Sequence, residues 1–256
     1  MKKSINLYFD NHELAKDKLL KIKAAGFDEF FTGLYAKQPD WSVEKQCAFA
    51  KTLGLPCTMI HCSYYEPDLH YFWEDGIFGD KICQDYCSQI RRSCGLTKNF
   101  VVHLNAEKEQ KQSLIGLQRI KQMLAVCEEC NMNLCVENLY SATEIPYIFN
   151  HIQHEKLKIC FDVGHKNFLT PDFEILKDYH EFVAVLHLHD NHGKADEHLA
   201  CGLGNVDWRK FAAELRLIPS VVLSCEVKKK EIDMLDNQTY LQKVLEGLLL
   251  IESYLK

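Results

Sequence analysis

The stretch Ser113–Glu137, SLIGLQRIKQMLAVCEECNMNLCVE, contains one complete copy of the unit from which this chain is built. Its first part is amphipathic, with charged residues beside an apolar face at helical spacing that is formed by Leu114, Leu117, Ile120 and Leu124. The helical pattern stops near Asn131, and a short apolar run, Leu134–Glu137, follows. That run is continuously apolar rather than alternating, which is typical of a parallel strand buried on both faces. The stretch therefore predicts a helix followed by a buried strand.

The same unit recurs on both sides of this stretch. Helical segments that stop near Gly26, Gly54 and Gly95 each lead into another apolar run. The chain has eight such runs: Ile5–Phe9, Phe27–Phe31, Cys57–Ile60, Phe100–Leu104, Leu134–Glu137, Ile159–Asp162, Val183–Leu188 and Val221–Glu226. Eight strand–helix units in 256 residues match the size of a (β/α)8 TIM barrel, so we expect one barrel domain over residues 1–256. A doubly wound sheet is the alternative, but it usually has fewer strands at this length.

Composition and charge exclude several classes of protein. A hydrophobic fraction of 47% excludes a disordered chain, and no apolar run approaches the ~20 residues of a membrane span. The net charge of −6 leaves no general basic surface for nucleic acid. The twelve cysteines, without an export signal, predict small buried side chains in a reducing cytoplasm. A homo-oligomer is compatible with all of this.

Polar side chains stand where the apolar runs end. Six of these residues are of types that bind metals: His61, His103, Glu137, Asp162, His187 and Glu226. His165, Asp196 and His198 follow closely. The carboxyl ends of barrel strands open on one face, where active sites form, and buried carboxylates are costly unless they are paired or bound to metal. A mixture of imidazole and carboxylate donors favours Zn²⁺, Mn²⁺, Co²⁺ or Fe²⁺, and an open site of this kind indicates catalysis.

At these positions the chain resembles the xylose isomerase-like TIM-barrel superfamily, in particular its sugar phosphate isomerase/epimerase branch. The matching motifs are Val136-Glu137-Asn138, Asp162-Val163-Gly164-His165, His187–His198, Gly202–Trp208 and Cys225-Glu226-Val227. The resemblance implies one divalent metal ion held by Glu137, Asp162, His187 and Glu226. It also implies that Glu137 and Glu226 act as acid and base on opposite faces of a substrate that passes through an enediolate, and that His165 contacts a substrate oxygen.

The superfamily also contains the endonuclease IV family, which cuts DNA at abasic sites with three zinc ions. All nine metal ligands of that family find matches in this chain: His61, His103, Glu137, Asp162, His165, His187, Asp196, His198 and Glu226. We therefore expect between one and three bound ions, Zn²⁺ or Mn²⁺. Only five arginines and a single lysine in the loop Thr32–Trp41 argue against a DNA substrate, because phosphate contacts dominate DNA affinity. A barrel that binds metal or sugar without catalysing a reaction is a third hypothesis.

The expected substrate is a small sugar or sugar phosphate. Aromatic and acidic residues in the loop His61–Gly79 are typical of a lid over such a ligand rather than of a DNA groove. We expect four residues to contact the substrate: Tyr64, Trp73, His189 and Lys194. Lys228, Lys229 and Lys230 follow the last apolar run, where barrels often hold phosphate, but a solvated loop explains them equally well.

Overall fold

The computed structural model describes residues 1–34, 41–63, 68–108, 110–230 and 235–255, and within them it contains an eight-stranded parallel sheet. The strands are β1 (Lys3–Asn6), β2 (Glu29–Gly33), β3 (Cys57–His61), β4 (Asn99–Val102), β5 (Asn133–Glu137), β6 (Leu157–Asp162), β7 (Val183–His187) and β8 (Leu223–Cys225). Neighbours in the sequence pair side by side, and β1 also pairs with β8. A parallel bridge between Leu188 and Cys225 joins β7 to β8 and closes the sheet. The TIM-barrel prediction is thus confirmed.

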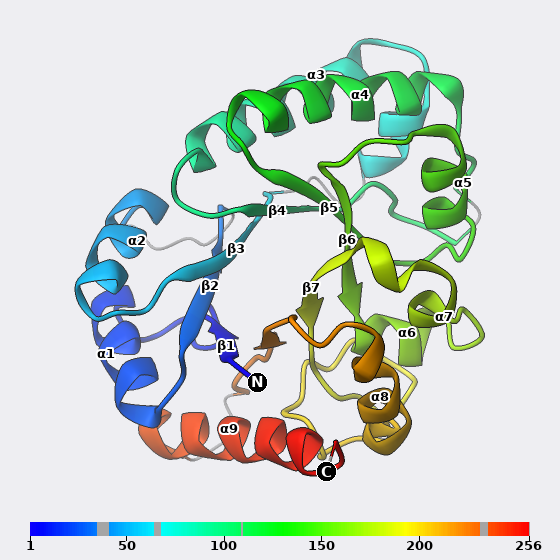
Figure 1. Cartoon of the computed structure of the whole chain (residues 1–256). Coiled ribbons are helices and arrows are strands. Elements are labelled where there is room, and N and C mark those ends of the chain that lie inside the picture. The colour runs from blue at the N-terminus through cyan, green and yellow to red at the C-terminus, as the bar shows by residue number, and fades with distance from the viewer. Residues whose placement is uncertain (35–40, 64–67, 109, 231–234, 256) are drawn as a thin grey trace.

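Helices surround this sheet, as Figure 1 shows in a view onto the face where the strands begin. They are α1 (Ala15–Ala25), α2 (Val43–Thr52), α3 (Ile77–Ser93), α4 (Leu114–Glu129), α5 (Glu144–His151), α6 (Val163–Leu169), α7 (Ile175–Tyr179), α8 (Trp208–Glu214) and α9 (Asn237–Ser253). Short 3₁₀ turns, including η1 (Asp68–Trp73), lie between some of them. The helix predicted from the stretch Ser113–Glu137 is α4, and Ser113 caps it by accepting a hydrogen bond from the backbone of Gly116.

The core is divided into an inner and an outer layer. Side chains from seven of the eight strand units meet inside the barrel: Tyr8, Phe31, Met59, Val101, Cys135, Cys160 and Val185. Apolar residues on the other side of the strands pack against the helices in two larger clusters. Because each strand is buried on both sides, its sequence is continuously apolar, as the runs predicted.

The predicted runs differ from the strands mainly at their ends. The run Ile5–Phe9 extends beyond β1, which ends at Asn6, and the run Val221–Glu226 is longer than β8. After β1 the apolar side chains of Leu7, Tyr8 and Phe9 continue into the loop above the barrel, where they remain buried without regular pairing. Before β8, Val221 and Val222 are only half-buried. Hydrophobicity reports burial, whereas strand bounds depend on pairing with a neighbour.

The cysteines are all free thiols, and seven of the twelve are buried. Cys130 of the Cys127-Glu128-Glu129-Cys130 motif is partly exposed at the end of α4, whereas Cys127 is buried. Among the described residues, no helix is both long enough and apolar enough to cross a bilayer.

Glu144, the first residue of α5, is a buried acid whose ionisation should be visible in the stability of the fold. Burial raises the pKa of its carboxyl from 4.5 to about 8, while Asn105 and Trp73 nearby oppose the shift. Between these two values the unfolded chain releases the proton and the folded chain keeps it, so stability falls as pH rises, by up to about 1.4 kcal/mol per pH unit.

We therefore expect that the stability of the Glu144→Gln variant does not show this fall with rising pH. Urea unfolding at about pH 5 and about pH 8 should show that the variant gains stability relative to the unsubstituted protein at the higher pH. Glu155→Gln, at a side chain that is 80% exposed, is the matched control. Parallel stability profiles for the Glu144 variant and the unsubstituted protein would contradict the assignment.

Candidate metal centre

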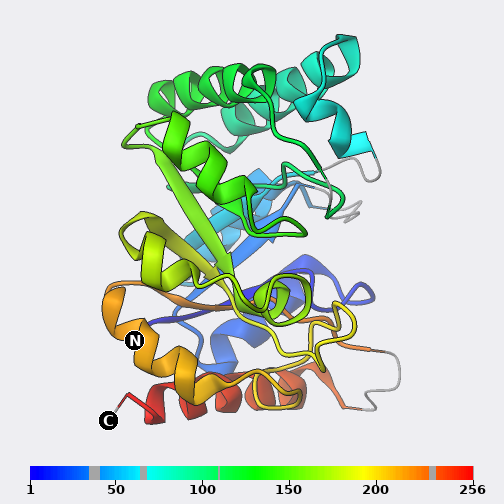
Figure 2. The ribbon, with the colours of Figure 1, turned by 90° about the vertical axis from the view of Figure 1, so that its right-hand side faces the viewer.

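The metal-type residues predicted from the sequence lie together at the carboxyl ends of the strands. Figure 2 shows this end of the barrel on the side opposite to the two chain termini. Four of the residues are the last residues of their strands: His61, Glu137, Asp162 and His187. His103 and Glu226 each follow directly after the last residue of a strand. The barrel thereby converts six distant sequence positions into one ring of donors.

The central group consists of Glu137, Asp162, His187 and Glu226, whose donor atoms all lie within 4.8 Å of one another. His187 Nδ1 is 3.2 Å from Glu137 Oε1, 3.2 Å from Glu226 Oε2 and 3.8 Å from Asp162 Oδ2. Donors held at about 2.0–2.2 Å from a four-coordinate ion lie about 3.3–3.6 Å apart. The buried Asp162 Oδ2 has no hydrogen-bond partner among the described residues. These residues fit one divalent metal ion.

A second group shares Glu137 with the first. His61 Nε2 and His103 Nε2 are 3.2 Å apart, and they lie 3.2 and 3.1 Å from Glu137 Oε2. Glu137 therefore turns Oε1 toward the central group and Oε2 toward the two histidines. A carboxylate with its two oxygens directed at separate donor sets is suited to bridging two ions.

A third group lies on the other side of the central one. Asp196 Oδ2 is 2.9 Å from His198 Nε2 and 3.7 Å from His165 Nε2. His189 is a further donor here, since its Nε2 is 3.2 Å from Asp162 Oδ1 and 3.5 Å from Asp196 Oδ1. Its ring is fully buried and stacks on that of His198. His189 thus lies between the central and third groups.

Backbone carbonyl groups fix the orientation of three of these histidines. The Nδ1 atoms of His61, His165 and His198 contact the carbonyl oxygens of Cys62, Asn138 and Glu226 at 2.9, 3.2 and 3.0 Å. A carbonyl oxygen can only accept, so each of these Nδ1 atoms donates to it, which leaves Nε2 as the nitrogen that can bind a metal. Metal-binding histidines commonly hold their second nitrogen in this way.

The carboxylates are buried close to imidazoles, and the charges favour their ionised forms. Burial alone would raise the pKa of Glu137, but His187 and His103 outweigh it and hold that pKa well below its usual range. Burial likewise opposes ionisation of Glu226, and His187 and His198 lower its pKa to about 2. Among the described residues, every ion pair of these two carboxylates and of Asp162 is with a histidine. Three buried carboxylates that pair with no lysine or arginine need a bound cation to compensate their negative charge.

Asp190 organises the loop between β7 and α8 that carries Asp196 and His198. Its fully buried carboxylate accepts hydrogen bonds from the backbone of Asn191, Gly202 and Val206 and from the indole of Trp208, at 2.8–3.1 Å. The backbone of His198 adopts a left-handed φ of 50° there, a conformation that costs energy and tends to persist at functional sites. In the sequence, Asp190 is one acid within the motif His187–His198, and this role was not predicted.

Gly164 is required by the packing of the third group. A Cβ atom at this position would stand 2.0 Å from His189 Cε1 and 2.4 Å from both ring nitrogens. The ring can therefore occupy its place only because residue 164 has no side chain. This gives a physical reason for the glycine between Asp162 and His165.

The residues expected to contact substrate lie in different surroundings. Trp73 is buried in a hydrophobic cluster, and its indole donates to Leu104 O at 2.7 Å, so it packs the core. Lys194 is exposed in the loop between β7 and α8, and His189 lies among the metal-type donors. Tyr64 lies outside the described residues, as does part of the expected lid. Tyr8, which was not predicted, donates to Glu226 Oε1 at 2.7 Å.

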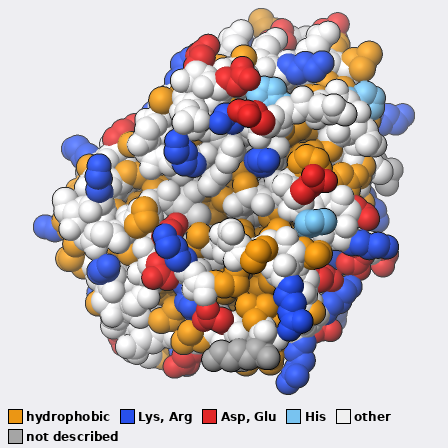
Figure 3. Space-filling view, viewed as in Figure 1, with side chains coloured by type: hydrophobic (Ala, Val, Ile, Leu, Met, Phe, Trp, Pro, Cys, Tyr) orange, Lys and Arg blue, Asp and Glu red, His pale blue; other side chains and the backbone are white. Residues whose placement is uncertain are grey.

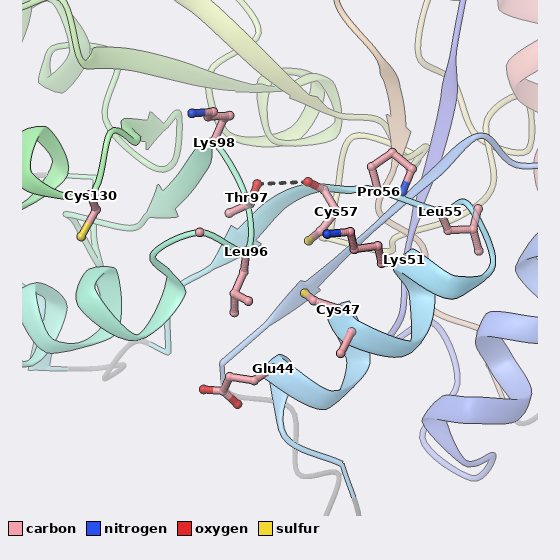
Figure 4. A pocket seen from close by; sticks show the side chains of 12 residues that line it. Glu44, Cys47, Lys51, Leu55, Pro56, Cys57, Leu96, Thr97, Lys98 and Cys130 are labelled. Atoms are coloured by element: carbon pink, nitrogen blue, oxygen red, sulfur yellow. Dashed lines mark hydrogen bonds between the residues drawn. The ribbon is translucent and has the colours of Figure 1, made fainter.

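A pocket of about 560 Å³ lies at the other end of the barrel, away from the metal-type residues, where the strands begin. Figure 4 shows its walls, formed by α2, the start of β3 and the segment before β4, with Cys47 and Cys57 among the lining residues. Figure 3 shows that this face carries acidic, basic and apolar side chains side by side. None of the nine metal-type residues lines the pocket.

The sequence is similar to parts of several curated proteins. Among curated relatives, two uncharacterized proteins of Methanocaldococcus jannaschii are similar: MJ1614, 29% identical over 126 residues, and MJ1311, 26% identical over 132 residues. These matches cover 47% and 44% of this chain and 49% and 45% of the relatives, so the chain matches about half of their length.

Several solved structures have the same architecture over the full length of this chain. A zinc-bound IolI protein superposes with a TM-score of 0.83 at 17% identity, with 99% of its own chain covered. D-psicose 3-epimerase from Clostridium cellulolyticum H10 superposes with a TM-score of 0.79 at 15% identity, with 100% of both chains covered. At such identities the likeness establishes the fold alone. The model of the xylose isomerase-like TIM barrel family matches residues 19–250, and this chain therefore belongs to that family.

Proposed function

We propose that this protein is a divalent-metal-dependent isomerase or epimerase of a small sugar or sugar phosphate, with Zn²⁺ or Mn²⁺ as its ion. The observation that carries the proposal is the placement of Glu137 and Glu226. They come from β5 and from the end of β8, and each has an oxygen 3.2 Å from the same His187 Nδ1. Similar structures that include a D-psicose 3-epimerase and an L-ribulose 3-epimerase support the class of reaction.

The side chains of this site would move and hold protons. Glu137 and Glu226 are ionised at neutral pH, so either can take a proton from the carbon beside the substrate carbonyl. The other glutamate would return a proton to the opposite face after it has itself taken one from solvent. Tyr8 holds Glu226 by a hydrogen bond, and His165 is placed to contact a substrate oxygen. The bound ion would polarise the carbonyl and a neighbouring hydroxyl, which stabilises the negative charge that develops.

Hydrolysis of a phosphoester is the second candidate, and a specific observation favours it. Nine predicted donors form three adjacent groups, and Glu137 is shared between two of them. Two-metal and multi-metal sites clamp both the attacking and the leaving oxygen of a phosphoester. A role for His61, His103, Asp196 and His198 in binding further ions would fit this reaction better than enolisation.

Two assays on one metal-loaded sample separate the candidates. The first follows deuterium from solvent into the carbon beside the carbonyl across a panel of ketoses and ketose phosphates. The second follows nicking of a duplex with one abasic site. We expect deuterium incorporation in at least one sugar and no nicking. Nicking without incorporation in any sugar would replace the isomerase by the phosphoesterase.

A further inference from the structure

A pocket separate from the donor groups opens at the same end of the barrel. It has a volume of about 900 Å³, and the segments that follow β4, β5 and β6 form its walls beside α5. We call it the α5 pocket. Its polar lining includes Lys108, Gln110, Lys111, Ser141, Thr143, Thr170 and Asp172. None of the nine metal-type residues lines it.

The charge of the α5 pocket is positive in a chain whose net charge is −6. Lys108 and Lys111 line it, and Asp172 is the one acid among its described lining residues. Neither lysine forms an ion pair within the described part of the chain. Two cations without a protein partner, facing one pocket, favour an anionic ligand.

Buried polar atoms of the pocket also lack partners. Gln110 and Thr170 are each 7% exposed, yet Gln110 Oε1 and Thr170 Oγ1 have no hydrogen-bond partner in the described structure. Nearby, the hydroxyls of Ser141 and Thr143 lie 2.9 Å apart. Buried polar groups in proteins are nearly always hydrogen-bonded, and the Thr170 hydroxyl, unlike the acceptor Gln110 Oε1, can donate to an anionic ligand.

The acid next to the pocket does not oppose an anion. Glu144 follows Thr143 directly, and burial raises the pKa of its carboxyl to about 8. It is therefore mostly protonated at neutral pH, and the charge of the pocket comes from the two lysines and Asp172.

One wall of the pocket lies close to the metal centre along the chain. Tyr140 lines the pocket and follows Glu137 by three residues. An extended chain spans at most about 3.6 Å per residue, so the two Cα atoms lie within about 11 Å. A phosphorylated pentose or hexose can extend over such a distance.

We infer that the α5 pocket is a second subsite, which binds an oxyanion at the far end of the substrate through Lys108 and Lys111. The hydroxyl of Thr170, which has no partner among the described residues, would donate to this oxyanion. The oxyanion is either a phosphate ester or a carboxylate. This inference rests on the proposed function, because the other end of the same molecule would lie at Glu137 and Glu226.

The test measures anion binding by calorimetry with metal-loaded, full-length protein, using inorganic phosphate and acetate as probes. The double variant Lys108→Gln/Lys111→Gln should bind phosphate at least about tenfold more weakly, because a hydrogen bond to a charged group contributes about 1.5–3 kcal/mol. Lys121→Gln/Lys243→Gln, at exposed positions on α4 and α9, is the matched control and should bind as the unsubstituted protein does. A loss for acetate that exceeds the loss for phosphate would identify a carboxylate substrate.

The outcome is separable from the proposed reaction. Neither lysine is a metal-type donor, so the metal content should stay unchanged in the double variant and any metal-bound phosphate contributes equally to all samples. A tenfold loss in a protein that exchanges no deuterium into any sugar would keep the subsite and reject the isomerase. Equal phosphate affinity in the double variant and the control would overturn the subsite, whatever the exchange assay shows.

Discussion

Replacing Glu226 by glutamine is expected to remove most of the bound metal from the purified protein. The substitution keeps the size of the side chain but removes one of three buried negative charges around His187 Nδ1. Changes in residues that only support metal ligands cost about 10–100-fold in affinity, so the loss of a charged ligand should cost at least tenfold. Elemental analysis after dialysis against a fixed free metal concentration measures the effect.

The control for this variant is Glu155→Gln, an exposed acid far from the site in the sequence, which should leave the metal content unchanged. Circular dichroism establishes that both variants are folded. Unaltered metal stoichiometry in the Glu226 variant, together with an unaltered dissociation constant, would show that Glu226 is not a ligand.

Replacing Glu137 by glutamine is expected to abolish deuterium exchange into the substrate, with a loss of about 10²–10⁴ in rate. Glutamine cannot accept the proton, and it also removes the charge that lies between two groups of histidines. The assay is run at saturating metal, so that weaker metal binding alone does not account for the loss. Tyr8→Phe provides a graded comparison, because it removes a hydrogen bond to Glu226 and leaves both carboxylates in place.

A Glu137 variant that exchanges deuterium at the original rate would exclude this residue as the acid or base. If exchange stays lost when metal content is restored to that of the unsubstituted protein, the effect belongs to proton transfer. If exchange returns with the metal, Glu137 acts as a ligand only.

The barrel could be predicted from the sequence because its signals are local. Apolar spacing at Leu117, Ile120 and Leu124 specifies the buried face of α4, and the continuous run Leu134–Glu137 specifies burial on both sides of a strand. Leu114, which was expected on the same face, is 67% exposed, because it is the first residue of the helix. Eight repeats of this pair leave few alternatives. Six of the nine metal-type residues could be found because each stands at the end of such a run, and a parallel barrel brings all of those ends to one face.

Other features were not readable from the sequence. Trp73 was expected to contact the substrate, but it packs among core residues, because its aromatic side chain is equally suited to either place. Asp190 reads as one more acid in a polar loop, and its four hydrogen bonds become apparent only once the loop folds back on it. The α5 pocket combines three segments that are far apart in the sequence.

The sequence by itself determined the order of helices and strands, the buried faces and the set of residues able to bind metal, because periodicity and residue type are properties of short segments. Only the tertiary structure decided which donor atoms share one ion. Glu137 turns one oxygen to His61 and the other to His187, which lie 76 and 50 residues away from it in the sequence. This arrangement depends on the distances between the strands that carry the three residues. Closure of the barrel between Leu188 and Cys225 sets those distances, since it fixes the diameter of the ring from which the side chains point inward.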